Sequence, residues 1–143
     1  MTLTKDMLYQ IFWECNEKYF NGALPEPNLA LHSSFTVPGR YDYTVNRYGE
    51  IVRDCISISK SFDWDEEHLI DVVLHEMIHE NVYEYGKDTG DGPHGKAFQD
   101  VMNTINARYG RHITIDQDLD KMKPAKWSNR LAWWFANQRA KRR

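Results

Sequence analysis

Apolar residues recur at steps of three and four positions near the start of the chain, from Met7 to Tyr19. Because an α-helix has about 3.6 residues per turn, this spacing predicts an amphipathic helix with one buried face. Thr4 is its expected N-cap, and the pair Asn21-Gly22 is its expected end. Two prolines follow closely and favour extended chain beyond the helix.

A second pattern occupies residues 29–59, where apolar and polar positions alternate in short runs. We expect strands at Leu29 to Phe35, at Tyr41 to Val45 and at Ile51 to Ser59, because successive side chains of a strand point to opposite faces. The intervening Arg47-Tyr48-Gly49-Glu50 is typical of a turn. Together these segments predict a small antiparallel sheet.

Helical spacing returns after the sheet. Ser61 or Asp63 can cap a second helix, and three acids at positions 65–67 fill its first turn, where the helix dipole favours negative charge. A broad apolar face then continues until Gly86, which is a natural end. The pattern therefore predicts a long, largely buried helix.

The remaining elements are shorter. We expect a third helix from His94 to Tyr109, ended by Gly110, after a loop rich in Gly and Asp. Two isoleucines at 113 and 115 indicate a short strand, and residues 128–140 a last helix. The predicted fold is α+β, one domain in which helices pack on a small antiparallel sheet.

Composition narrows the class of protein. The chain has 143 residues, of which 41% are hydrophobic, enough for one ordinary core. Cys15 and Cys55 are its only cysteines, so a four-cysteine zinc ribbon is excluded. No signal peptide and no apolar run of membrane-spanning length is visible. We therefore expect a cytoplasmic protein with free thiols and no membrane partner.

The central chemical signal is His75-Glu76-Met77-Ile78-His79, which lies inside the predicted second helix. Four residues turn a helix by about 400°, so the two imidazoles project from one face and can share a zinc ion. Glu76 points to the side of that face, where it can take a proton from the water that zinc activates. The alternative is a helix that merely carries two histidines. It is disfavoured because such groups are costly to bury without partners.

Catalytic zinc needs a third protein ligand from outside this helix. His94 is the best candidate, because imidazole suits zinc and because Gly95 beside it lets the backbone pack closely. By chemistry alone, Asp88, Asp91 and Asp100 remain alternatives.

Two paired motifs, His75-Glu76-Met77-Ile78-His79 and His94-Gly95-Lys96-Ala97-Phe98, resemble the SprT-like zinc metallopeptidases, the group that includes Spartan. The signature of that family is HExxH followed by HGxxF, and the resemblance covers residues 5–110. It implies a zincin-like metal-binding helix in which His75, His79 and His94 bind Zn²⁺ and Glu76 is the general base. The chain departs from some relatives in lacking the cysteines of a C-terminal zinc ribbon. The loop 80–93 is also long.

Several further residues have candidate roles beside this site. Tyr109, Arg111 and His112 follow the third helix, and any of them could stabilise an oxyanion. Asp71 lies one turn before the first histidine, so it is either an acceptor that orients the imidazole or a solvated helix residue.

Other polar residues of the second helix are expected to be peripheral. His68 lies near the metal-binding face, but a three-ligand site does not need it as a ligand. Glu80 and Glu84 are expected on the solvated face.

Charge is divided unevenly along the chain. All 21 acids lie in residues 1–120, whereas residues 121–143 hold eight of the 18 basic residues together with four large aromatics. We expect a metallopeptidase domain at 1–120 and a basic, aromatic-containing C-terminal segment at 121–143. Cations beside aromatics suit DNA, above all single strands. The alternatives are aromatics packed on the domain and a segment paired with its acidic body.

The expected function is that of a zinc metalloendopeptidase, with a protein or peptide substrate and DNA-bound proteins as one option. One alternative is a nucleic-acid-binding module with a structural or inactive zinc site. Glu76 argues against it, because a structural site needs no general base. Another is an amidase acting on a non-peptide bond, since the same attack serves any acyl transfer.

Overall fold

Helix α1 (Lys5–Phe20) begins and ends where the sequence predicts. In the computed structural model, which describes residues 1–86 and 90–125, the Thr4 hydroxyl accepts a hydrogen bond from the Met7 N–H at 3.2 Å. Asn21 adopts the left-handed conformation at the other end, with φ 56°. The buried face of α1 carries Leu8 and Phe12 into the core. A capped, amphipathic helix thus forms from its local signals.

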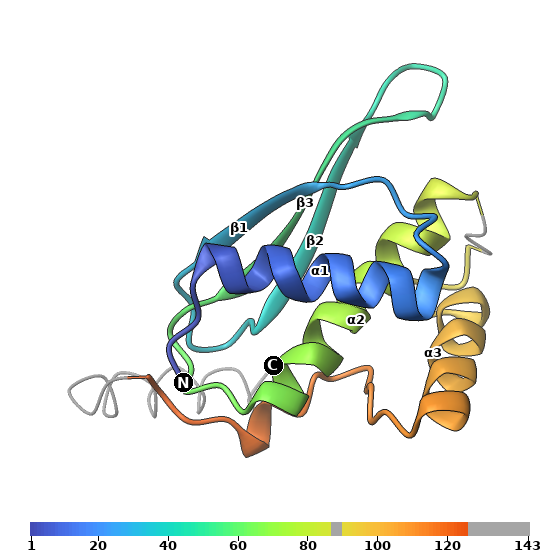
Figure 1. The fold of residues 1–143 in the computed structure, drawn as a ribbon. Coiled ribbons are helices and arrows are strands. Elements are labelled where there is room, and N and C mark those ends of the chain that lie inside the picture. Colours follow the sequence, from blue (N-terminus) through green and yellow to red (C-terminus); the bar gives the residue numbers. More distant parts are fainter. Residues whose placement is uncertain (87–89, 126–143) are drawn as a thin grey trace.

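The sheet has three strands: β1 (Asn28–His32), β2 (Gly39–Val45) and β3 (Ile51–Ser59), in the order β1-β3-β2. β2 and β3 form the predicted antiparallel hairpin, which extends away from the helices (Figure 1). β1 pairs with β3 in parallel, so the sheet is mixed and the prediction of an antiparallel sheet was wrong for this strand. The short connection 33–38 reverses the chain between β1 and β2. Because β3 then enters between them, it runs antiparallel to β2 and parallel to β1.

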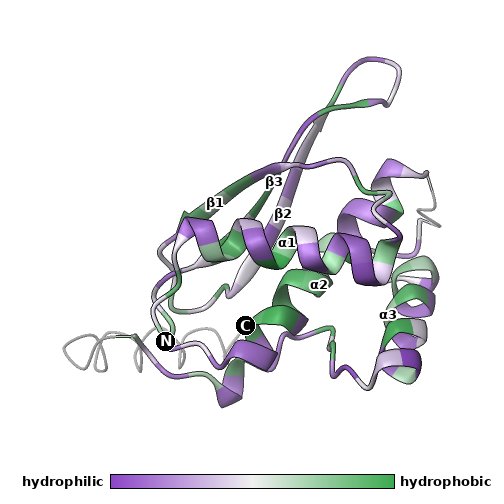
Figure 2. Cartoon of the chain, viewed as in Figure 1, coloured by the Kyte–Doolittle hydropathy of each residue, from purple (hydrophilic) through white to green (hydrophobic). Residues whose placement is uncertain are grey.

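Helix α2 (Glu66–Glu84) runs through the centre of the molecule (Figure 1). Its N-cap is Asp65, whose carboxylate accepts a hydrogen bond from the His68 N–H at 3.0 Å. The predicted caps, Ser61 and Asp63, lie too early, because the chain first buries Phe62 in the core. Apolar residues line α2 along most of its length (Figure 2). A helix apolar on most sides must be covered by other elements, and α1, the sheet and α3 (Lys96–Tyr109) pack against it.

The chain crosses back to α2 after α3 ends at Gly110, which is left-handed with φ 68°. We call residues 111–118 the strap. Ile113 is buried, but its backbone N–H and C=O pair with the side chain of Asn106 at 2.9 and 3.0 Å. The predicted strand at 113–115 therefore does not form, because a side chain takes the place of a partner strand.

A short 3₁₀ turn, η1 (Leu119–Lys121), follows the strap. The helix predicted at 128–140, and most of the basic C-terminal segment, lie outside the described residues. Over the described part of the chain, no helix has the length and apolar character needed to cross a membrane.

Candidate metal centre

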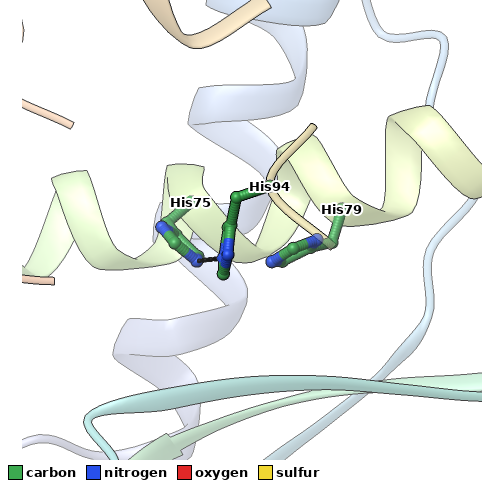
Figure 3. A group of neighbouring side chains, drawn as sticks. All are labelled: His75, His79 and His94. Carbon is green, nitrogen blue, oxygen red and sulfur yellow. Dashed lines mark hydrogen bonds between the residues drawn. The ribbon is translucent and has the colours of Figure 1, made fainter. Parts of the chain in front are cut away.

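Three imidazoles from two segments converge beside α2. His75 and His79 lie one turn apart on that helix, and their ring centroids are 5.0 Å apart. His94, from the loop before α3, turns its ring between them (Figure 3). One ring nitrogen from each lies within 4.8 Å of the others, so the three could hold a metal ion.

The loop before α3 places His94 by means of a glycine. The Asp91 carboxylate accepts a hydrogen bond from the Lys96 N–H at 2.8 Å and so caps the first turn of α3. A Cβ added at Gly95 would overlap this carboxylate, so the predicted need for a small residue beside His94 has a specific cause. Asp91 is thus occupied at the helix end, and Asp100 pairs with the Lys96 ammonium at 2.7 Å. The third alternative ligand, Asp88, lies outside the described residues.

Phe98 forms an apolar wall against the three histidines. Its ring centroid lies 4.9 Å from those of His75 and His94 and 4.7 Å from that of His79. Phe98 is itself buried. It therefore excludes water from one side of the cluster and limits rotation of the imidazoles. This gives a structural reason for the aromatic residue four positions after His94.

The tautomer of His75 is set by a backbone carbonyl. His75 Nδ1 lies 2.8 Å from the oxygen of Thr114, and a carbonyl oxygen can only accept a hydrogen bond. The proton therefore resides on Nδ1, which leaves a lone pair on Nε2, the nitrogen that faces His94 at 3.2 Å. Such an acceptor behind a metal-binding imidazole fixes its orientation and raises its basicity as a ligand.

Burial keeps the cluster in the form that binds metals. Desolvation lowers the pKa of His75 to about 4, and desolvation together with the neighbouring imidazoles lowers the pKa of His79 to about 3. Desolvation also lowers the pKa of His94. All three rings are therefore neutral near pH 7, where a metal ion meets little competition from protons.

Glu76 lies next to the imidazoles with its carboxylate in the protein interior. The side chain is only 3% exposed, and Oε2 lies 4.0 Å from Nε2 of His75. Burial raises the pKa of Glu76 to about 8, while a hydrogen bond from Gln117 acts in the opposite direction. A cation held by the imidazoles would favour the ionised carboxylate further.

The start of β2 covers the other side of this carboxylate. A Cβ at Gly39 would lie 3.0 Å from both Glu76 Oε2 and Val72 Cγ1. Contacts this short require a neighbour to move, so glycine lets the strand approach the acid closely. Glu76, beside the candidate metal centre, thus lies against the first residue of strand β2.

A model of the SprT-like family matches residues 8–118, which include both motifs and all three histidines. The chain belongs to the SprT-like family. The family resemblance predicted from the two motifs is therefore confirmed. No match was found among curated proteins.

In this SprT-like chain, an ion-pair cluster ties the strap to α2. Arg111 donates from Nε to Asp71 and from Nη1 to Glu67, each at 2.8 Å. Asp71 is therefore neither the acceptor for His75 nor a solvated residue, because the strap supplies a guanidinium for it and a carbonyl for the histidine. The exposed fractions of the Arg111 and Asp71 side chains are 12% and 10%, so their pair is largely shielded from water.

The expected oxyanion donors are placed in different surroundings. The Tyr109 hydroxyl donates to the Lys18 carbonyl on α1, and Arg111 is engaged by the acids of α2. His112 is exposed and lines a small hollow with His68 and His75. His68 itself bonds the Gln117 carbonyl at 2.8 Å, so it supports the strap. The donor that does reach Glu76 is Gln117, which sequence reasoning missed.

The prediction that Glu80 lies on the solvated face of α2 is wrong. Its side chain is fully buried, and neither carboxylate oxygen has a hydrogen-bond partner among the described residues. Burial, with the charges of Asp54 and Glu84 nearby, raises the pKa of Glu80 to about 9. The group is therefore neutral at pH 7. Glu84, one turn later, is exposed as predicted.

This carboxyl group should make stability depend on pH. The folded-state pKa of Glu80 lies above the unfolded value, so its contribution is fully present below about pH 4.3 and is lost as pH rises towards 9. Glu80→Gln cannot ionise. Between pH 5 and pH 8, we expect its stability relative to the unsubstituted chain to rise by about 4 kcal/mol. Urea unfolding of both metal-free chains at the two pH values measures this difference.

The buried amide of Glu80→Gln can change stability by an amount that does not depend on pH. Subtracting the difference at pH 5 from the difference at pH 8 removes that amount. Glu66→Gln is the matched control, because that acid is exposed in the first turn of the same helix, fourteen positions before Glu80. A stability difference for Glu80→Gln that stays the same at both pH values would show that Glu80 titrates as it does in the unfolded chain.

Proposed function

We propose that this chain is a zinc-dependent peptidase in which Glu76 is the general base. The observation that carries the proposal is the juxtaposition of three neutral imidazoles with a buried carboxylate whose oxygen lies 4.0 Å from the ligating nitrogen of His75. Three nitrogen ligands are the donor set of a catalytic zinc site with one open position. The arrangement supports a zincin-like role for α2, with both motif histidines on one face.

The residues of the chain fit the metal and its chemistry. When bound, zinc would polarise the scissile carbonyl and lower the pKa of a water molecule. Glu76 would take the proton of the attacking water and pass it to the leaving amine. Phe98 and the neighbouring core would keep bulk water away from the imidazoles, and Thr114 would hold His75 in the ligating tautomer.

The sheet supports a peptide as the substrate. β2 is an edge strand, and its first residue, Gly39, lies against Glu76. An extended peptide can add to a sheet edge through main-chain hydrogen bonds. Such a peptide would pass beside the carboxylate and the imidazoles, as cleavage of its backbone requires.

A structural or inactive zinc site is the alternative. A closed structural site has four protein ligands, whereas the cluster found in the described residues has three. A purely structural site also has no need of a carboxylate oxygen 4.0 Å from His75 Nε2, the position that Glu76 occupies. These points favour the catalytic proposal.

The direct test is cleavage of a loosely folded DNA-binding protein by the zinc-loaded chain. We expect fragments that disappear after chelation of the metal and return when zinc is added back. No cleavage of this or other polypeptides by a chain that holds zinc would contradict the peptidase proposal. Hydrolysis of a small amide substrate by that same chain would then favour the amidase.

A role for DNA rests on the basic segment 121–143 and is part of the same experiment. Cleavage that rises with added single-stranded DNA would support contact through the basic residues, especially if the gain falls with salt. Zinc-dependent cleavage at a rate that does not change with added DNA would support the peptidase and contradict a role for DNA. The same comparison with residues 126–143 deleted tests whether that segment carries the effect.

A further inference from the structure

The strap is held against both α2 and α3. The guanidinium of Arg111 binds Asp71 of α2, and the carbonyl of Gln117 accepts a hydrogen bond from His68 Nε2 of α2 at 2.8 Å. Between these contacts, the backbone of the buried Ile113 pairs with the Asn106 side chain of α3. Its last two residues, Gln117 and Asp118, both have left-handed backbones, with φ 61° and 53°. Non-glycine residues rarely adopt this conformation, so the surrounding contacts must hold it.

This backbone directs the Gln117 side chain at the proposed base. Its Nε2 donates a hydrogen bond to Oε2 of Glu76. The same oxygen lies 4.0 Å from His75 Nε2 and faces Gly39 on its other side. The contact therefore falls on the carboxylate oxygen that lies beside His75. Within the described residues, Gln117 is the one hydrogen-bond donor to the Glu76 side chain.

We propose that Gln117 is a positioning residue, which holds the Glu76 carboxylate in the orientation that faces the metal centre. The inference rests on the proposed function of Glu76 as the base. A glutamate side chain has several rotatable bonds, and Glu76 needs one fixed orientation to accept a proton. A carboxylate oxygen can accept more than one hydrogen bond, so the amide does not use up the acceptor capacity of Oε2.

The strap thereby performs two supporting tasks from one short segment. Its Thr114 carbonyl sets the tautomer of the ligand His75, and its Gln117 amide sets the orientation of Glu76. Groups that orient metal ligands and bases commonly change activity by about 10- to 100-fold when they are removed. The effect should appear in kcat, because Gln117 acts on the base and does not hold the metal.

The test is Gln117→Met, which keeps an unbranched side chain of similar length while removing the amide. We expect kcat to fall by about 10- to 100-fold with KM within about threefold and zinc affinity unchanged. The matched control is Gln10→Met, because Gln10 also donates to a glutamate, Glu14, at 3.0 Å on the exposed face of α1. That control should keep its kcat.

A second readout does not depend on activity. In nitrogen-15 spectra of the metal-free chain, the side-chain amide signals of Gln117, identified by their loss in Gln117→Met, should move when Glu76→Gln is introduced. The amide signals of Gln10 should stay in place. If the Gln117 signals did not move in Glu76→Gln, the hydrogen bond between Gln117 and Glu76 would be contradicted.

Each kinetic result separates the possibilities. Unchanged kcat in Gln117→Met overturns the inference, and so does a rise in kcat, which would make the contact a brake. A joint loss of kcat, zinc affinity and thermal stability would show a structural role for Gln117 and would also overturn it. Failure of the proposed function is a different outcome, namely a zinc-loaded parent chain that shows no Glu76-dependent cleavage.

Discussion

Glu76→Gln is expected to lower kcat by about 10²- to 10⁴-fold while the chain still binds one zinc ion. The substitution preserves the size of the side chain and leaves an oxygen that can accept the Gln117 hydrogen bond. It removes the group that can take a proton from water. The residues that could hold the metal are His75, His79 and His94. Glu76 is not one of them, so metal binding should persist. Steady-state cleavage and metal analysis on the same preparation measure both properties.

The control for this substitution is Glu84→Gln, two turns further along α2 and exposed. It should retain the kcat of the parent chain. If the kcat of Glu76→Gln stayed within tenfold of that of the parent chain, Glu76 would not be the general base. Loss of zinc together with turnover would instead place Glu76 in the metal-binding set.

His79→Ala is expected to weaken zinc binding by more than about 100-fold, because even groups that only support a ligand contribute about 10- to 100-fold. His79 supplies one of three nitrogens in the cluster, and His75 and His94 alone would leave two open positions. Activity should fall with zinc occupancy. Competition with a chromophoric chelator measures the affinity.

The thermal transition provides a second measure of the same change. A ligand that binds only the folded chain raises the midpoint temperature of unfolding. Added zinc should therefore raise this temperature far more in the parent chain than in His79→Ala. His112→Ala is the control, since His112 is exposed and lies outside the cluster. Equal zinc affinity in His79→Ala and the parent would show that the ion binds elsewhere.

The parts of the fold that were predicted correctly have local signals. Thr4 and Asn21 mark the ends of α1, and alternation marks β3 with the bounds Ile51–Ser59 that the structure shows. The parallel pairing of β1 with β3 has no local signal, because it follows from where a later strand enters the sheet. Likewise, Ile113 has the pattern of a strand residue, but the Asn106 side chain occupies its backbone groups.

In the candidate site too, the residues with a local sequence signal were predicted and those without one were missed. Helical geometry alone places His75 and His79 on one face, and the structure brings His94 to them. Gln117 lies 41 positions after Glu76, and nothing in its neighbourhood in the sequence marks it as a partner. Thr114 contributes a carbonyl, which every residue possesses, so its role could not be predicted from residue type.

Glu80 shows how a residue type can mislead. An acid is usually solvated, and that general tendency predicted an exposed position. However, Glu80 lies one turn after Glu76, on the side of α2 that the neighbouring elements cover, and its side chain is fully buried. The tertiary arrangement of the sheet on α2, which the sequence does not encode locally, decides its environment.

X-ray absorption at the zinc edge of the zinc-loaded chain tests most directly whether the three histidines form an open zinc site. We expect three imidazole nitrogens at about 2.0–2.1 Å and one further light-atom ligand from water. Glu76→Gln should give the same spectrum, whereas His79→Ala should lose the signal of the three-histidine site. A sulfur ligand at about 2.3 Å, or a fourth imidazole in place of water, would reveal a closed site and contradict a catalytic zinc centre.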